Sequence, residues 1–205
     1  MKFLNLVAVF VFVLTLVACT SVQQSTRIST TLRSQEYNSL ASRYMERPTF
    51  VEVETLSSGE TVLMVEMDTY AVPSTYRGLR LSPGEAEVLR KSQLRFLKEY
   101  VNKYVAAIDK FLEWESLASQ RKEAFTRDIS SVPAWGNIGN GTFKFKFHSG
   151  NDRSHFLVIA FSAAGTTLDE KAQYFDVRNA KELKRLLLAF ESGSIQHTAL
   201  DDIYK

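Results

Sequence analysis

The chain has 205 residues, of which 45% are hydrophobic, and its 25 basic side chains nearly balance 23 acidic ones, for a net charge of +2. A near-neutral chain with interspersed signs lacks the basic stripe of nucleic-acid binders, so we expect no nucleic-acid partner. The chain has a single cysteine, Cys19, which excludes intrachain disulfides.

Residues 1–18 have the pattern of a signal peptide. Lys2 precedes an apolar run from Leu6 to Val17, and the run ends in Leu16-Val17-Ala18-Cys19. This arrangement resembles the lipobox of bacterial lipoproteins, which implies cleavage between Ala18 and Cys19 and a lipid anchor on the Cys19 thiol. An uncleaved N-terminal anchor and a general secretory signal are the alternatives.

The lipobox resemblance also implies a location. Two or three acyl chains, palmitate among them, would hold the body at a membrane lastingly, whereas one chain binds marginally. Thr20 follows the cysteine where members retained at the inner membrane typically carry aspartate. The resemblance therefore implies the outer membrane, facing the periplasm, rather than the inner membrane.

Residues 19–46 are rich in Ser, Thr, Gln and Arg and show no sustained apolar period, which predicts the lipidated cysteine followed by a flexible polar tether. A short, weakly amphipathic helix near 34–46 is an alternative, ended by Pro48. A single domain then covers 47–205, with possible halves 47–129 and 130–205.

The first half begins with a predicted hairpin. Val51 and Val53 alternate with Glu52 and Glu54, a turn follows at 57–60, and residues 61–67 are apolar, as expected of two paired strands. Residues 79–81 predict a short third strand.

A long helix is predicted from Ser82-Pro83-Gly84-Glu85, a capping-box start. An apolar stripe at helical spacing runs from Leu94 to beyond Phe111. Unbroken to about residue 124, this helix would be about 60 Å long, while a domain of this size is about 40 Å across. We therefore expect a break or a projecting end after about residue 118.

The second half repeats this order. After a loop at 130–141, Phe143, Phe145 and Phe147 alternate with lysines and pair with an apolar strand over 155–161. A strand at 173–177 and a helix capped at Asn179 and stopped by Gly193 follow, then a loosely held tail to Lys205.

The predicted fold class is α+β: antiparallel β-hairpins with one long and one shorter amphipathic helix in one two-layer domain. The similar order of the halves indicates a possible duplicated ββ(β)α unit. This order resembles that of Pur-alpha-like and Whirly-like folds, although the sequence does not show the aromatic and basic binding face of those families.

Two tryptophans are candidate partner contacts. Trp135 stands beside Pro133 and Gly136 in the predicted loop, and Trp114 lies at the margin of the long helix's apolar stripe. Exposed aromatic rings anchor partners or sugars, although both rings could instead belong to the core. We expect the working surface to combine the far part of the helix with the Trp135 loop.

The segment from His148 to His155 also gathers polar side chains. His148, Asp152 and His155 could hold Zn²⁺ or Cu²⁺ if a hairpin turn brought them together, but turns collect such residues for backbone reasons. We therefore predict a solvated turn, with these three residues as weak metal candidates, and no cofactor.

The chain contains no lipase-type Gly-x-Ser-x-Gly, His-Glu-x-x-His, phosphate-loop or dinucleotide glycine motif. The leading hypothesis is therefore a lipid-anchored, non-catalytic cell-envelope interaction module that binds a protein or an envelope component. The alternatives are a small-molecule or metal-binding periplasmic lipoprotein and an enzyme whose active site is assembled from distant residues.

Overall fold

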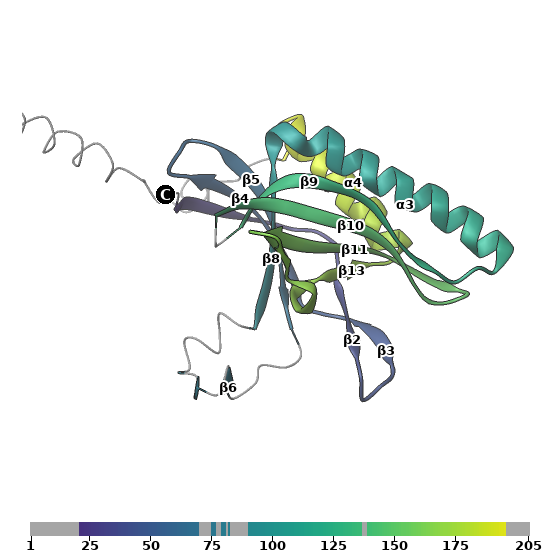
Figure 1. Cartoon of the computed structure of the whole chain (residues 1–205). Coiled ribbons are helices and arrows are strands. Elements are labelled where there is room, and N and C mark those ends of the chain that lie inside the picture. The colour runs from purple at the N-terminus through teal and green to yellow at the C-terminus, as the bar shows by residue number, and fades with distance from the viewer. Residues whose placement is uncertain are drawn as a thin grey trace, which may run out of the picture.

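The computed structural model describes residues 21–69, 75–76, 79–80, 82, 90–136 and 139–195. Within these ranges eleven strands form one antiparallel sheet, and helices α3 (Val101–Arg121) and α4 (Val177–Glu191) cover one of its faces side by side (Figure 1). The predicted α+β class is confirmed, with more sheet than the two expected hairpins supply. The strands of the sheet are β1 (Val22–Ile28), β2 (Gln35–Asn38), β3 (Arg43–Glu46), β4 (Thr49–Leu56), β5 (Thr61–Asp68), β8 (Lys91–Leu97), β9 (Thr126–Gly136), β10 (Gly139–Asn151), β11 (Ser154–Ala163), β12 (Thr166–Thr167) and β13 (Gln173–Phe175).

The N-terminal chain crosses the whole sheet. β1 forms one edge beside β4, while the β2–β3 hairpin forms the other edge beside β13. Between them Leu32 is fully buried, and the backbone N–H of Arg33 donates to Asn179 Oδ1 at 2.8 Å. The predictions of a flexible tether and of a helix near 34–46 are therefore wrong for residues 22–46, because two sheet edges offer this segment backbone partners. The signal sequence and Cys19 lie outside the described residues.

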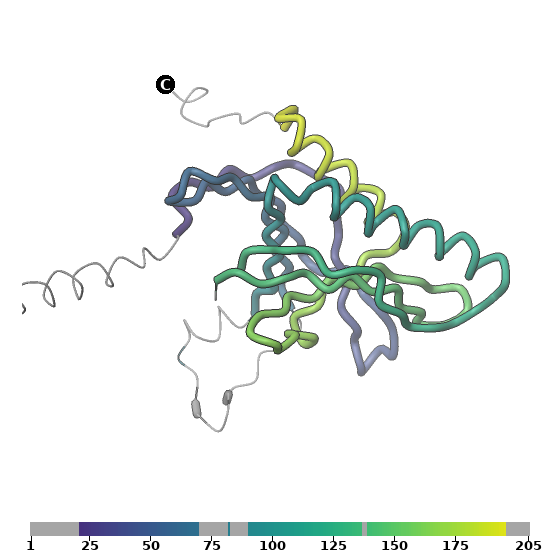
Figure 2. Tube along the Cα trace, turned by 45° about the horizontal axis from the view of Figure 1, so that its top comes forward, coloured from purple at the N-terminus to yellow at the C-terminus, as the bar shows by residue number. Residues whose placement is uncertain are grey.

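The core lies between the two helices and one face of the sheet (Figure 2). Both predicted hairpins are confirmed as β4–β5 and β10–β11, with Val53 opposite Leu63 and Phe145 opposite Ile159. The alternation places Phe143, Phe145 and Phe147 fully buried under the helices. On the opposite face a smaller apolar cluster of Phe156, Val158, Ala160 and Ala172 is covered by Tyr44 and Tyr174.

The long helix begins later than predicted. Residues 91–97 form strand β8 against β5, and a 3₁₀ turn, η1 (Lys98–Tyr100), separates β8 from α3. Leu94 and Phe96 face the core while Arg95 faces away, so the same residues satisfy strand alternation as well as helical spacing. Pairing with β5 decides between the two. Of the predicted cap, only Ser82 is described.

The helix ends close to the break that we expected after about residue 118. α3 stops at Arg121, where Lys122 adopts a left-handed conformation (φ 55°). The short third strand predicted at residues 79–81 does not join the first hairpin. Residues 79–80 form β7 (Leu79–Arg80), which pairs with β6 (Thr75–Tyr76) in a separate two-stranded sheet.

Two further predictions are wrong. The expected loop at 130–141 is largely strand, because Trp135 and Pro133 belong to β9 and pair with Asn140 and Thr142 of β10. The cap of α4 is Asp176, whose side chain accepts from the backbone N–H of Asn179. Asn179 is buried in the first turn, where its amide joins the chain segment before β2. Gly193, with φ 72°, follows the helix end as expected.

The two parts of the sheet meet where β8 adjoins β9. Arg95 of β8 pairs with Trp135 of β9 and forms a bidentate ion pair with Glu54 of β4, at 2.6 and 3.1 Å. Both charged residues are buried, with exposed fractions of 5% and 4%. Above the same junction the Tyr104 hydroxyl of α3 donates to the Pro133 carbonyl and accepts from the Leu97 N–H.

The buried ion pair predicts strong coupling between Glu54 and Arg95. Replacing Arg95 with Met leaves the Glu54 carboxylate buried without its cation, which should cost about 3 to 5 kcal/mol of unfolding free energy. Adding Glu54→Leu should recover part of that loss. Urea denaturation of both single variants and the double variant measures the coupling, and additive effects would contradict it.

The Tyr104 hydroxyl should stabilise the junction without filling it. Tyr104→Phe removes only this oxygen and leaves the Pro133 carbonyl and the Leu97 N–H without it, so we expect a loss of about 1 to 3 kcal/mol. Thermal and urea unfolding test this expectation. A variant as stable as the natural protein would show that the hydroxyl does not tie β8 to β9.

Candidate functional site

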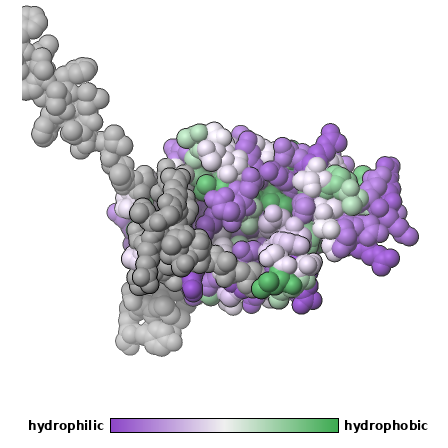
Figure 3. Space-filling model, turned by 60° about the horizontal axis from the view of Figure 1, so that its bottom comes forward, coloured by the Kyte–Doolittle hydropathy of each residue, from purple (hydrophilic) through white to green (hydrophobic). Residues whose placement is uncertain are grey.

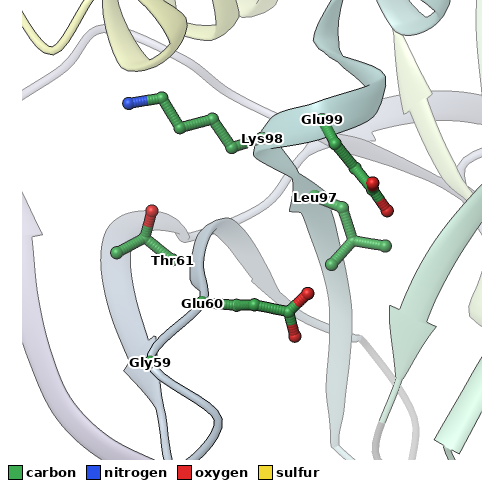
Figure 4. A pocket seen from close by; sticks show the side chains of 6 residues that line it. All are labelled: Gly59, Glu60, Thr61, Leu97, Lys98 and Glu99. Carbon is green, nitrogen blue, oxygen red and sulfur yellow. The ribbon is translucent and has the colours of Figure 1, made fainter.

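Trp135 lines an open cleft at one end of the sheet. The cleft has a volume of about 280 Å³ and adjoins a second hollow of about 290 Å³ that shares Glu60, Leu97 and Glu99 with it (Figure 4). The other lining residues are Tyr100, Pro133, Ala134, Asn140 and Gly141 in the cleft, and Gly59, Thr61 and Lys98 in the second hollow.

Close packing surrounds the cleft at this end of β9. A Cβ on Gly141 would lie 2.4 Å from the Ser162 carbonyl and 2.6 Å from the Phe161 ring, so only glycine lets β10 approach β11 there. The guanidinium of Arg95 lies 5.1 Å from the centre of the Trp135 ring, within the range of a cation–π contact. Nearby, a hydrogen bond to Glu99 raises the pKa of Tyr100.

Trp114 lines a different pocket, which we call the Trp114 pocket. It has a volume of about 230 Å³ and lies beside the C-terminal end of α3 and the start of β9. Trp114 is partly buried against Phe125 and Phe147, with both ring centroids 6.3 Å from its own. The remaining lining residues are Leu117, Ala118, Arg121, Glu123 and Arg127.

The Trp114 pocket combines apolar side chains, Trp114 and Leu117, with the basic side chains of Arg121 and Arg127 at its edge. Leu117 is 44% exposed, which is high for a leucine, and sits beside the half-buried indole. The Arg127 guanidinium lies 5.4 Å from the indole centre. Arg121 forms a long ion pair of 3.9 Å with Glu123, and both side chains are more than half exposed, so this pair contributes little to stability.

The two tryptophans therefore do not form one surface. Arg127, at the Trp114 pocket, pairs with Phe147, whereas Trp135 pairs with Asn140. Arg127 and Trp135 are eight positions apart in β9, which is about 27 Å of extended strand. The predicted working surface separates into two sites at opposite ends of β9. The sequence alone did not indicate Phe125 or Arg127 as part of a site, because both follow the break or projecting end that we expected after about residue 118.

The two candidate metal-binding histidines lie on opposite faces of the sheet. His148 pairs with Phe156 and the adjacent Ser149 pairs with His155, so the two rings point apart. Asp152 is exposed in the turn between them. Among the described residues, no group of three His, Cys, Asp or Glu side chains could hold a metal ion.

His155 instead ties the end of α3 to β11. Its side chain is 1% exposed, and Nδ1 lies 3.8 Å from the Glu115 carboxylate. Nε2 lies 3.2 Å from the Glu123 carbonyl, which only accepts hydrogen bonds. The Ser119 hydroxyl donates to Glu115 at 2.7 Å and lies 3.4 Å from Nδ1. The Ser119 hydroxyl thus donates to the Glu115 carboxylate and not to the His155 ring. Ser119, Glu115 and His155 therefore hold α3 against β11 and do not have the arrangement of an activated serine nucleophile.

Comparison with known proteins gives no further assignment. No protein-family profile matches the chain, and neither the curated proteins nor the solved structures contain a significant match. In the parts of the chain that the structure describes, no helix is both long and apolar enough to cross a membrane.

The His148 ring gives a pH-dependent prediction. It lies between the Tyr44 hydroxyl (2.7 Å) and Thr126 (2.8 Å), and burial lowers its pKa below the ordinary value of 6.5. The folded state therefore binds its proton less readily than the unfolded state, so this contribution to stability is complete above about pH 6.5 and is lost as the pH falls below it.

Replacing His148 with Gln removes the titrating group and keeps a polar side chain beside Tyr44. The difference in unfolding free energy between the natural protein and His148→Gln should shift against the natural protein between about pH 7.5 and pH 5. Urea denaturation at several pH values measures this difference. Parallel curves would contradict the prediction.

Proposed function

We propose that the protein is a lipid-anchored component of the bacterial cell envelope that acts as a non-catalytic interaction module. The anchor is proposed from Leu16-Val17-Ala18-Cys19, and the residue after it, Thr20, favours the periplasmic face of the outer membrane. The observation that carries the interaction role is the Trp114 pocket, in which an exposed leucine and a half-buried indole lie beside two arginines.

The size of the pocket supports a macromolecular partner rather than an enclosed ligand. Sites that enclose small molecules usually have volumes of about 300 to 1,000 Å³, and the Trp114 pocket has about 230 Å³. Such a hollow fits one projecting side chain of a partner. Trp and Arg are also the residues that most often dominate binding energy at protein interfaces.

The charges around the pocket indicate what the partner offers. Two basic side chains, Arg121 and Arg127, line the pocket together with one acidic side chain, Glu123. A partner segment with an apolar side chain next to a carboxylate would complement this rim.

We also propose that the body is a duplicated unit. Strands β1, β4, β5 and β8 precede α3, and strands β9, β10, β11 and β13 precede α4. The repeated order of four neighbouring antiparallel strands and one helix supports this proposal.

A site-specific crosslink tests the interaction role. A photoreactive amino acid at Leu117 of the full chain in cells should give a discrete crosslinked product. Leu188 of α4 is the matched control, because it is also a helical leucine and is 43% exposed. The product should be identified by mass spectrometry, and it should weaken when Arg127→Ser is added. Similar background at both positions would contradict the proposal.

A further inference from the structure

Ser21, the first residue that the structure describes, lies against the β4–β5 turn at one end of the sheet. β1 begins at Val22, and Ser21 is already fixed to the β4–β5 turn. Its N–H donates to Ser57 Oγ at 3.0 Å, and its carbonyl accepts from the Ser57 N–H at 2.8 Å. Two residues of extended chain span at most about 7 Å. The Cα atom of Ser21 therefore lies within about 7 Å of the Cα atom of Cys19, the residue that would carry the lipid.

We propose that the end of the body formed by residues 21–26 and the β4–β5 turn (57–60) rests on the lipid headgroups and presents the Trp114 pocket away from the membrane. This inference depends on the proposed lipid anchor on Cys19. In place of the mobile tether that we expected, only Cys19 and Thr20 would then connect the lipid to the folded body.

The charges of the two ends support this orientation. Residues 21–26 and 57–60 contain one charged side chain, Glu60, and η1 beside them adds Lys98 and Glu99, so few fixed charges are desolvated when this end meets the headgroups. The opposite end is strongly charged and hydrophilic on the face that Figure 3 shows. Its charged residues are Arg121, Lys122, Glu123, Arg127, Asp128, Asp152 and Arg153.

The long helix separates the two ends. α3 starts next to η1, which lines the same hollow as Gly59 and Glu60, and runs 21 residues away from it. That length is about 32 Å at 1.5 Å per residue. Figures 1 and 2 both show β1 and the β4–β5 turn at the end of the body opposite the C-terminal end of α3.

Spin labels on introduced cysteines test the orientation, because lipidation would block the only natural thiol. The lipidated full chain carries a nitroxide at Ser58→Cys in the β4–β5 turn or at Gln120→Cys in the last turn of α3. It is reconstituted in phosphatidylethanolamine and phosphatidylglycerol vesicles that contain a nickel-chelating lipid. Relaxation of the Ser58→Cys label should be enhanced severalfold over that of the Gln120→Cys label. Equal enhancement, or a larger effect at Gln120→Cys, would overturn the orientation.

Two controls separate the orientation from the anchor. A Gly/Ser insert of about 12 residues between Thr20 and Ser21 has a root-mean-square length of roughly 20 Å and should abolish the difference between the labels. A difference that persists unchanged would show that the short attachment does not cause it. Flotation with the vesicles reports the anchor itself. Chain that fails to float, like Cys19→Ala, overturns the anchor, whereas chain that floats with equal labels overturns only the orientation.

Discussion

The pairing of β8 with β9 makes a single sheet of what would otherwise be two, and the buried Arg95–Glu54 ion pair lies at this junction. An ion pair taken out of water is stable only when its geometry is good and its remaining hydrogen-bonding groups are satisfied. Arg95 meets this condition through two bonds to Glu54 and a third to Gln93 at 2.9 Å. On the helix side, the Tyr104 hydroxyl joins the same two strands.

The junction also determines where the candidate sites lie. Trp135 of β9 lies at the junction, and Arg127 lies near the other end of the same strand. The length of β9 therefore separates the Trp135 cleft from the Trp114 pocket. Gln173 of β13 also contacts the first part of the sheet, because its side-chain amide donates to the carbonyls of Val65 and Ser92 at 3.2 and 2.9 Å. A body built in this way presents two different ends, one near β1 and one near the end of α3.

The sequence contains enough information for the hairpins and the second helix, but not for the path of the chain between them. The valines of β4 and the phenylalanines of β10 alternate strictly, and strand alternation is a local signal. Residues 91–97 satisfy both a strand and a helix pattern, and only their pairing with β5 decides. Residues 22–46 look like a tether because they lack an apolar period of their own, and they become strands only by pairing at the two edges of the sheet, with β4 and with the distant β13. Of the candidate site, Trp114 was predictable, whereas its neighbours Phe125 and Arg127 required the start of β9.

Mass spectrometry of the N-terminal peptide, from protein extracted from its native membrane, tests the proposed lipid anchor. We predict a mature chain that begins at Cys19, with a diacylglyceryl group on its thiol and no residue before it. A chain that retains Met1, or that carries an unmodified Cys19, would contradict a lipid-anchored envelope protein. It would also remove the basis for placing the β4–β5 turn at a membrane.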